Sequence, residues 1–312
     1  MKSDMSSTPS AFLIAGPTAS GKSALALAIA EAFNGAIINA DSMQVYDTLQ
    51  VLTARPDAAD LVRVPHYLYG HVSPQSDYSV GHWVMDATAA MAQVRANGQV
   101  PVFTGGTGLY FRALLHVLAD IPDIPARLRE GLRQRLEDDG VHALHAELHA
   151  RDPKLATRLH PNDPQRILRG LEVVEATGRA LSDWQADKQA PLLSEPATCL
   201  MLAPARDWLY ARCDARFQTM LADGAVQAEI AALSALNLPP QAMVLKALGL
   251  AELQAVADDG MDVEAAIAQA QMHTRRYAQR QMTWFRNQIE KPDVILAQYS
   301  ERNKEEISSY TF

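Results

Sequence analysis

The chain has 312 residues and a formal net charge of -8, and its 48% hydrophobic and 21% charged residues are ordinary for a globular protein. The acidic balance argues against a protein that coats nucleic acid non-specifically, because such binding needs many cations at the phosphates. The two cysteines, Cys199 and Cys213, exclude both a disulfide framework and a four-cysteine zinc site.

The cellular location is indicated by the first residues and by the hydropathy pattern. The first ten residues are polar and lack the apolar core of a signal peptide, and no later stretch is long enough to span a bilayer. The low cysteine content favours a reducing compartment. We therefore expect a cytoplasmic protein, and we expect it to be a monomer.

A phosphate-binding loop is predicted near the start of the chain. Residues 16–23 read GPTASGKS, follow the apolar run 11–15 and precede the alanine- and leucine-rich segment 24–30. The pattern G-x-x-x-x-G-K-[ST] requires this context of strand, loop and helix. A di- or triphosphate is expected to bind the whole loop, which consists of Gly16, Pro17, Thr18, Ala19, Ser20, Gly21, Lys22 and Ser23.

Each residue type in this loop has a physical reason. Gly16 and Gly21 allow backbone angles that are closed to other residues, so that successive amides can converge on one anion. The helix that follows adds its unpaired amides and the positive end of its dipole. Lys22 places an ammonium on the outer phosphate oxygens, and the Ser23 hydroxyl is positioned to ligate Mg²⁺. Binding of a phosphate by this loop does not by itself imply hydrolysis.

Two further strand ends are expected beside the loop, because ligands of an open α/β sheet bind at the carboxyl ends of its strands. Asp41 follows the apolar run 36–40, and its position allows a helix cap, a metal ligand or a base, with the cap favoured. The strand 100–104 is followed by two glycines and Thr107. Nucleotide hydrolases usually carry a magnesium-binding aspartate there. The glycines instead indicate a close approach by another backbone or a ligand, and the Thr107 hydroxyl suits a phosphate or base contact.

The middle of the chain predicts a helical insertion into an α/β core with a parallel sheet flanked by helices. Prolines mark a boundary near residue 121, and the helices expected beyond it span 127–139, 142–150 and 165–177. The predicted domains are a first part of the core (1–121), an all-helical insertion (122–192) and a second part of the core (193–312).

The second part of the core is expected to contain two more strands and two basic helices. The expected elements are the strand 197–203, a helix from 207, an amphipathic helix over 262–290 and a short strand at 294–296. In the first part of the core, residues 47–81 predict mostly irregular structure, and a helix is expected over 79–97. Arg206, Arg212 and Arg216 are spaced so that two or three could face one anion, although Arg212 alone is typical of an ordinary exposed arginine.

Seven segments together resemble the tRNA dimethylallyltransferases. They are GPTASGKS (16–23), DSMQVY (41–46), TARP (53–56), VPHYL (64–68), GGTGLYF (105–111), HPNDPQR (160–166) and TRRYAQRQMTWFR (274–286). The resemblance implies a P-loop NTPase-like core with a helical insertion that binds tRNA. It also implies transfer of a dimethylallyl group from dimethylallyl diphosphate to N6 of the adenosine 3′-adjacent to the anticodon, in tRNAs that read codons starting with U.

The resemblance also implies roles for individual residues. Lys22, the loop amides, Arg216 and a Mg²⁺ ion at Ser23 would stabilise the departing diphosphate. Asp41 would accept a proton from the adenine amino group, and Thr107 would position the reacting groups. The target base is expected to flip out of its stack. The residues implied to contact tRNA are Asp41, Ser42, Met43, Gln44, Arg129, Gln165, Arg166, Ile167, Leu168, Arg169, Gln279, Arg280, Gln281, Met282, Thr283, Trp284, Phe285 and Arg286.

The chain departs from the family pattern at three points. Leu52 stands where the family has glycine, Gly249-Leu250-Ala251 replaces a glycine-tyrosine-basic segment, and a Cys/His finger is absent after the core. The departures leave Lys22, Asp41 and Thr107 unchanged. His66 matches a family histidine, and a satisfied, partly buried histidine is the expectation for it.

Two other functions are compatible with parts of the sequence. A small-molecule or nucleoside kinase would use ATP on the same loop, but it needs neither basic helix. A nucleotide-gated RNA-binding module without catalysis would leave Asp41 beside the loop unexplained.

Overall fold

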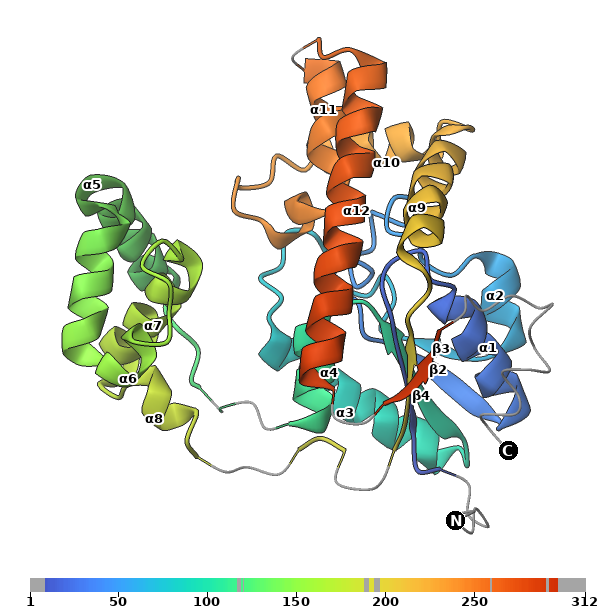
Figure 1. The fold of residues 1–312 in the computed structure, drawn as a ribbon, viewed down its shortest axis with the longest axis horizontal. Coiled ribbons are helices and arrows are strands. Elements are labelled where there is room, and N and C mark those ends of the chain that lie inside the picture. Colours follow the sequence, from blue (N-terminus) through green and yellow to red (C-terminus); the bar gives the residue numbers. More distant parts are fainter. Residues whose placement is uncertain are drawn as a thin grey trace. The chain divides into compact units, whose positions relative to one another are not determined.

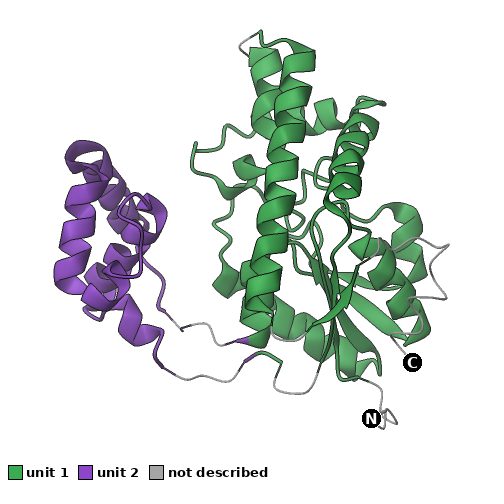
Figure 2. Ribbon diagram, viewed as in Figure 1, with its two compact units in different colours: residues 1–115, 192–312 green, residues 116–191 purple. Residues whose placement is uncertain are grey.

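A computed structural model describes residues 9–116, 119, 121–187, 191–193, 197–258, 260–289 and 292–296. The chain divides into two compact units (Figure 2). The core unit comprises residues 1–115 and 192–312, and the helical unit comprises residues 116–191. Among the described residues, no helix is both long and apolar enough to cross a membrane.

The core unit contains a six-stranded sheet in the order β3-β2-β4-β1-β5-β6, and each described strand pair is parallel (Figure 1). The predicted α/β class with a parallel sheet is therefore confirmed. The strands are β1 (Phe12–Ala15), β2 (Gly35–Asn39), β3 (His66–Tyr67), β4 (Val100–Gly105), β5 (Thr198–Leu202) and β6 (Asp293–Ile295).

Helices flank this sheet. The helices of the core unit are α1 (Lys22–Ala32), α2 (Ala58–Arg63), α3 (Val80–Ala96), α4 (Gly108–Leu115), α9 (Arg206–Leu221), α10 (Ala225–Ser234), the 3-10 helix η1 (Met243–Lys246), α11 (Leu250–Asp258) and α12 (Val263–Gln288). The predicted helices correspond to α1, α3, α9 and α12, whereas α2, α4, α10, η1 and α11 were not predicted.

The central strands carry apolar side chains on both faces, as strands buried on both sides must. Phe12, Ile14 and Ile37 pack into one core cluster with α1. Leu13 and Ile38 alternate with them and therefore point to the opposite face of the sheet. Both faces of the sheet are therefore covered, and the loops that can bind a ligand follow the carboxyl ends of the strands.

The helical unit is built around its own apolar core. Its helices are α5 (Ala126–Arg151), α6 (Pro153–Ala156), α7 (Pro164–Thr177) and α8 (Leu181–Trp184). The sequence predicts a break between two helices at residues 139–142, and α5 is indeed interrupted at Gly140, where φ is 79° and ψ is 163°. Asp163 caps α7 by accepting a hydrogen bond from the Arg166 amide (3.2 Å), with Pro164 in the first turn.

The segment 44–56 is more ordered than the expected irregular structure. Gln44 Nε2 donates to the carbonyls of Thr53 and Ala54 at 2.9 Å each. The Glu229 carboxylate on α10 accepts hydrogen bonds from three successive backbone amides, those of Gln50, Val51 and Leu52, at 2.9, 2.6 and 3.1 Å. The region 47–81 also contains α2 and β3, which the sequence analysis missed because both are very short.

Two of the family departures lie together at this segment. Leu52 is buried, and a Cβ added to Gly249 would lie 3.6 Å from Leu52 Cδ1. Leu250 is also fully buried. The leucine that replaces a family glycine is thus accommodated by packing beside the turn that begins α11.

Replacing Glu229 with alanine is expected to destabilise the fold by about 1–3 kcal/mol, because three backbone amides lose one charged acceptor. Urea denaturation measures this effect as a lower midpoint with an unchanged slope. Gln227→Ala, at an exposed position of the same helix, is the control and should leave the midpoint nearly unchanged. Equal midpoints for the two variants would contradict the role given to Glu229.

Candidate active site

The phosphate loop connects β1 to α1 and has the backbone of an anion cradle. Gly21 lies in the left-handed region with φ 93°, as predicted for a glycine at this position. Ala19 also has a positive φ of 64°, which is rare for a residue with a side chain. Gly16 has a different role from the predicted one. An added Cβ would lie 2.9 Å from Ser20 Oγ and 3.2 Å from Leu202 Cβ, so glycine is needed there for close packing.

Thr18 anchors this loop to two helices. Its amide donates to Gln281 Oε1 on α12 at 2.8 Å, and its hydroxyl accepts a hydrogen bond from the Arg216 guanidinium on α9. Lys22 Nζ donates to the Pro17 carbonyl at 3.4 Å. The buried Ser20 hydroxyl has no hydrogen-bond partner among the described residues. Side chains of α9 and α12 therefore hold the loop, and the Ser20 hydroxyl within the loop is left without a protein partner among the described residues.

A cavity of about 320 Å³ opens at the loop. Its polar wall comes from Lys22, Ser23, Arg212 and Arg216 together with Glu31, Asp60 and Arg63, and Ala24, Leu27 and Ala28 of α1 form an apolar wall. Arg212 is exposed, as expected, yet it lines this cavity one helical turn before Arg216. Arg206 is not among the lining residues, and its guanidinium lies 5.1 Å from the centre of the Tyr210 ring.

The charges around the cavity favour an anion. The pKa of Lys22 is lowered to about 8, mainly by burial; the negative charge of Asp41 opposes this shift, and the positive charge of Arg216 adds to it. Burial also lowers the pKa of Arg216. A bound anion would offset both effects, because it would supply the negative charge that these cations lack. In the described part of the chain, no group of three or more His, Cys, Asp or Glu residues could hold a metal ion.

Asp41 lies at the end of β2 in a tightly bonded turn. Its backbone amide donates to Asn39 Oδ1 and its carbonyl accepts from Asn39 Nδ2, both at 2.9 Å. Asp41 Oδ1 accepts a hydrogen bond from the Met43 amide at 3.0 Å, so one carboxylate oxygen has a local capping role. The other oxygen, Oδ2, would lie 3.1 Å from a Cβ added to Gly106.

Thr107 fixes the backbone beside Asp41. Its hydroxyl accepts a hydrogen bond from the Ser42 amide at 2.8 Å and donates to Ser42 Oγ at 3.1 Å. Its own amide donates to the Ala40 carbonyl at 3.2 Å. In this structure Thr107 therefore holds the turn that carries the carboxylate.

The two glycines before Thr107 mark a close approach, as predicted. A Cβ on Gly105 would lie 2.1 Å from the Ala40 carbonyl group, and one on Gly106 would lie 2.1 Å from Gln281 Nε2. The Gln281 Nε2 group donates to the Gly106 carbonyl at 2.8 Å. One side-chain amide thus joins the phosphate loop to the end of β4.

Three tyrosines lie near Asp41 and were missed by the sequence analysis. Burial raises the pKa values of Tyr69, Tyr110 and Tyr277, and the negative charge of Asp41 contributes to each shift. The Tyr110 ring stacks on Trp83 with centroids 4.1 Å apart. All three tyrosines stay neutral at physiological pH, so they add no charge near the carboxylate.

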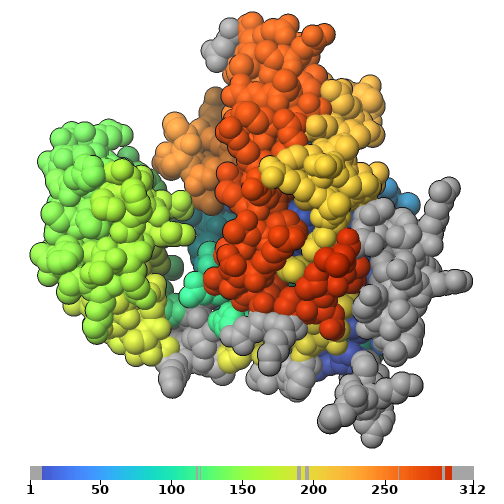
Figure 3. Space-filling model, viewed as in Figure 1, coloured from blue at the N-terminus to red at the C-terminus, as the bar shows by residue number. Residues whose placement is uncertain are grey.

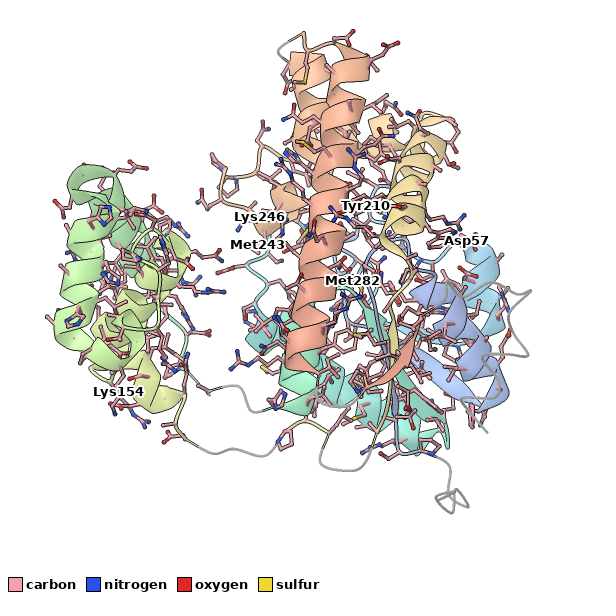
Figure 4. All side chains as sticks on the ribbon, in the orientation of Figure 1. Asp57, Lys154, Tyr210, Met243, Lys246 and Met282 are labelled. Atoms are coloured by element: carbon pink, nitrogen blue, oxygen red, sulfur yellow. The ribbon has the colours of Figure 1, made fainter. Side chains whose placement is uncertain are left out.

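The residues implied to contact tRNA separate into exposed and buried sets. Gln279, Arg280, Thr283 and Trp284 line a cavity of about 530 Å³ together with Arg276, Asn287 and Gln288, all on α12. Figure 3 shows α12 exposed along this face. Tyr210 reaches this region from α9, where its hydroxyl donates to Gln279 Oε1 at 3.1 Å (Figure 4). Arg286 is also exposed.

Four of the implied contact residues have buried side chains. Gln281, Met282 and Phe285 are on the side of α12 that packs into the core unit, and Ile167 is 0% exposed in the core of the helical unit. A direct contact between these four side chains and RNA therefore does not fit the structure. Gln281 in particular bonds to the protein itself.

The remaining sites of the helical unit are on its surface or at its edge. Gln165 and Arg166 are exposed on α7, while Leu168, Arg169 and Arg129 are partly buried. Arg166 pairs with Asp163 at 3.2 Å, and Arg169 pairs with Glu172 at 3.4 Å. In the core unit, Ser42, Met43 and Gln44 are partly buried beside Asp41.

His66 is a partly buried histidine, in line with the expectation for it. Its Nδ1 is 2.9 Å from the Val64 carbonyl, and burial lowers its pKa. This hydrogen bond satisfies one ring nitrogen, and the structure assigns His66 no contact with the loop.

Comparison with known proteins gives a consistent set of relatives. The model of the IPP transferase family matches residues 44–288, and that of the isopentenyl transferase family matches residues 9–69. The tRNA dimethylallyltransferase of Rhizobium meliloti (strain 1021) is 50% identical over 294 residues, covering 91% of this chain and 96% of the relative. That of Rhodopseudomonas palustris (strain BisB18) is 55% identical over 280 residues, covering 89% and 88%.

Solved structures agree with these relatives. The full-length tRNA isopentenylpyrophosphate transferase from Bacillus halodurans aligns with a TM-score of 0.67 and 31% identity, over 97% of this chain and 96% of that one. A eukaryotic dimethylallyltransferase acting on tRNA aligns with a TM-score of 0.76 and 29% identity, over 88% of this chain and 69% of that one.

The lowered pKa of Lys22 predicts a pH-dependent affinity for anions. Lys22 is charged below about pH 8 and loses its proton above it, so binding of inorganic diphosphate should weaken as the pH rises through this value. Calorimetric titration on either side of that pH measures the change. Lys22→Arg is the control, because arginine stays charged throughout and any titration of the ligand affects both proteins equally. Parallel pH profiles for the two proteins would contradict the assignment.

Proposed function

The chain belongs to the tRNA dimethylallyltransferase family, and on this basis we propose that it transfers a dimethylallyl group from dimethylallyl diphosphate to N6 of the adenosine 3′-adjacent to the anticodon. The tRNAs concerned read codons that start with U. The observation that carries this proposal is that one glutamine amide joins the phosphate loop, whose cavity Lys22 and Arg216 line, to the Gly106 carbonyl beside the Asp41 carboxylate. The kinase alternative finds no support among the relatives.

On the donor side, Lys22, Arg216 and the loop amides hold the diphosphate. As the bond between the allylic carbon and oxygen breaks, its electron pair leaves with the diphosphate, and these groups stabilise the charge that develops there. Arg212 adds a second guanidinium at the mouth of the cavity.

Mg²⁺ fits this site if the substrate supplies most of its ligands. No acidic cluster is found among the described residues, so the protein would supply the Ser23 hydroxyl and the substrate would supply phosphate oxygens. The unsatisfied Ser20 hydroxyl in the same loop is consistent with a polar ligand there. When bound, Mg²⁺ neutralises charge on the diphosphate.

On the acceptor side, Asp41 is the proton acceptor. The lone pair of the adenine amino group is delocalised into the ring, so the nitrogen is a weak nucleophile until it loses a proton. Asp41 takes that proton as the new bond between nitrogen and carbon forms. Thr107 and Asn39 keep the carboxylate in place through the turn at 40–42.

The RNA binds on the exposed face of α12 and on α7 of the helical unit. The α12 face carries Arg276, Arg280 and Arg286, and Trp284 offers a flat ring beside them. Because phosphate contacts by arginine orient RNA and aromatic rings stack on unpaired bases, this face suits an anticodon loop. We place the reaction in the cytoplasm, with the protein acting as a monomer.

The proposal is tested by incubating the purified protein with unmodified tRNA and either dimethylallyl diphosphate or ATP, followed by mass analysis of the nucleosides. A dimethylallyl adenosine that forms only with the allylic donor supports it. Unchanged RNA together with transfer of the terminal phosphate of ATP to a small acceptor would support the kinase instead. Tight RNA binding with no product from either donor would favour a binding module.

Asp41→Ala is expected to lower the rate of transfer about 100- to 10,000-fold, the usual contribution of a positioned base, while tRNA affinity stays nearly unchanged. Arg280→Ala is the reciprocal variant and should weaken tRNA binding and flatten its salt dependence, with little change in the rate at saturation. Single-turnover kinetics and a binding titration separate the two effects. A large loss of tRNA affinity in Asp41→Ala without a loss of rate would refute the base assignment.

A further inference from the structure

The side chain of Gln281 lies at the junction of the two halves of the site. It is 5% exposed and makes two hydrogen bonds to the backbone across the core unit, and it also interacts with the hydroxyl of Tyr277 on the same helix. Oε1 accepts from the Thr18 amide and Nε2 donates to the Gly106 carbonyl, each at 2.8 Å. Thr18 belongs to the phosphate loop, and Gly106 precedes Thr107, which holds the turn of Asp41. The amide therefore spans the distance between the donor cradle and the proton acceptor.

Nothing else in the chemistry proposed above requires a glutamine at this position. Met282 and Phe285 on the same helix are apolar and fill the core, so packing alone would be served by an apolar side chain. A buried amide is costly unless both of its groups are paired, and here both are paired with backbone atoms of the site. The glycine at 106 is needed to admit it, since a Cβ there would lie 2.1 Å from Gln281 Nε2.

We propose that Gln281 is a positioning residue that keeps the phosphate loop and the Asp41 turn at the relative position that transfer requires. This proposal rests on the proposed function and adds a role that does not involve contact with RNA. A displacement of about 1 Å between reacting groups can lower a rate by about 100-fold. Loss of the bridge should therefore reduce the rate of transfer more than it reduces the affinity for either substrate.

Three variants test this role. Gln281→Met keeps the length and volume of the side chain but removes both hydrogen bonds, and kcat should fall about 10- to 100-fold. The affinities for inorganic diphosphate and for tRNA should change by no more than about twofold by the same argument. Gln271→Met is the matched control, because Gln271 is also on α12 and donates one hydrogen bond to the Asp214 carbonyl of α9 at 3.1 Å, away from the loop. It should keep kcat.

Gln281→Glu gives a second readout that does not depend on the stability of the methionine variant. A protonated carboxyl group offers one donor and one acceptor, as the amide does, whereas the ionised form offers acceptors only. The ratio of kcat in Gln281→Glu to kcat in the wild type should therefore rise as the pH falls. An ionised carboxylate at this position would also lie near Asp41, so a rising ratio supports the proposal only together with the loss of kcat in Gln281→Met.

The result that would overturn the proposal is a folded Gln281→Met protein with kcat within about twofold of the wild type, or an equal loss in Gln271→Met. A pH-independent ratio for Gln281→Glu would overturn it as well. Hydrogen exchange of the peptide 16–23 distinguishes a wrong role for Gln281 from a wrong proposed function. Exchange of the Thr18 amide should accelerate in Gln281→Met even if the wild type transfers no prenyl group, and unchanged exchange would refute the bridge itself.

Discussion

The close approach at Gly105 and Gly106 is the constraint on which the site depends. A parallel sheet brings the carboxyl ends of β1, β2 and β4 to one edge, but it does not by itself set how near the following loops lie. The missing side chains at these two glycines allow the Ala40 carbonyl group and the Gln281 amide to occupy space that a Cβ would fill. Hydrogen bonds of Gln281 on α12 then join the phosphate loop to Gly106, and Gly105 packs against the turn that carries Asp41.

This packing places two cations and the Asp41 carboxylate close enough for their charges to interact. Lys22 and Arg216 are partly buried on the phosphate side, and burial lowers the pKa of each, which means that the protein alone does not fully compensate their charged forms. Asp41 lies on the other side among Tyr69, Tyr110 and Tyr277. A diphosphate at one end of the substrate would meet Lys22 and Arg216, and the amine that attacks its other end would lie at Asp41.

Much of the fold could be predicted from local patterns. The phosphate loop, the strand before Asp41, the helix over 262–290 and the break near Gly140 all depend on residues close in sequence, and periodicity or turn chemistry identifies them. The reason for Gly16 could not be predicted, because it needs glycine for contact with Leu202 of a distant strand. The short elements within 47–81 carry too few residues for a pattern to emerge.

The parts of the site that escaped prediction depend on contacts between distant residues. Gln281 and Thr18 are 263 positions apart, and Glu229 is 177 to 179 positions from the amides it accepts. A motif match grouped Gln281 and Ile167 with exposed neighbours, since a run of sequence does not reveal which face of a helix is buried. The tyrosines near Asp41 come from three segments and share no spacing.

The central claim is that the anion in the phosphate loop is a leaving group and that no phosphoryl group moves. It is tested most directly with dimethylallyl diphosphate that carries a heavy oxygen isotope between carbon and phosphorus. All of the label should appear in released diphosphate, and the modified adenosine should gain only the hydrocarbon group. Label in the RNA, or release of monophosphate with phosphorylated RNA, would contradict it.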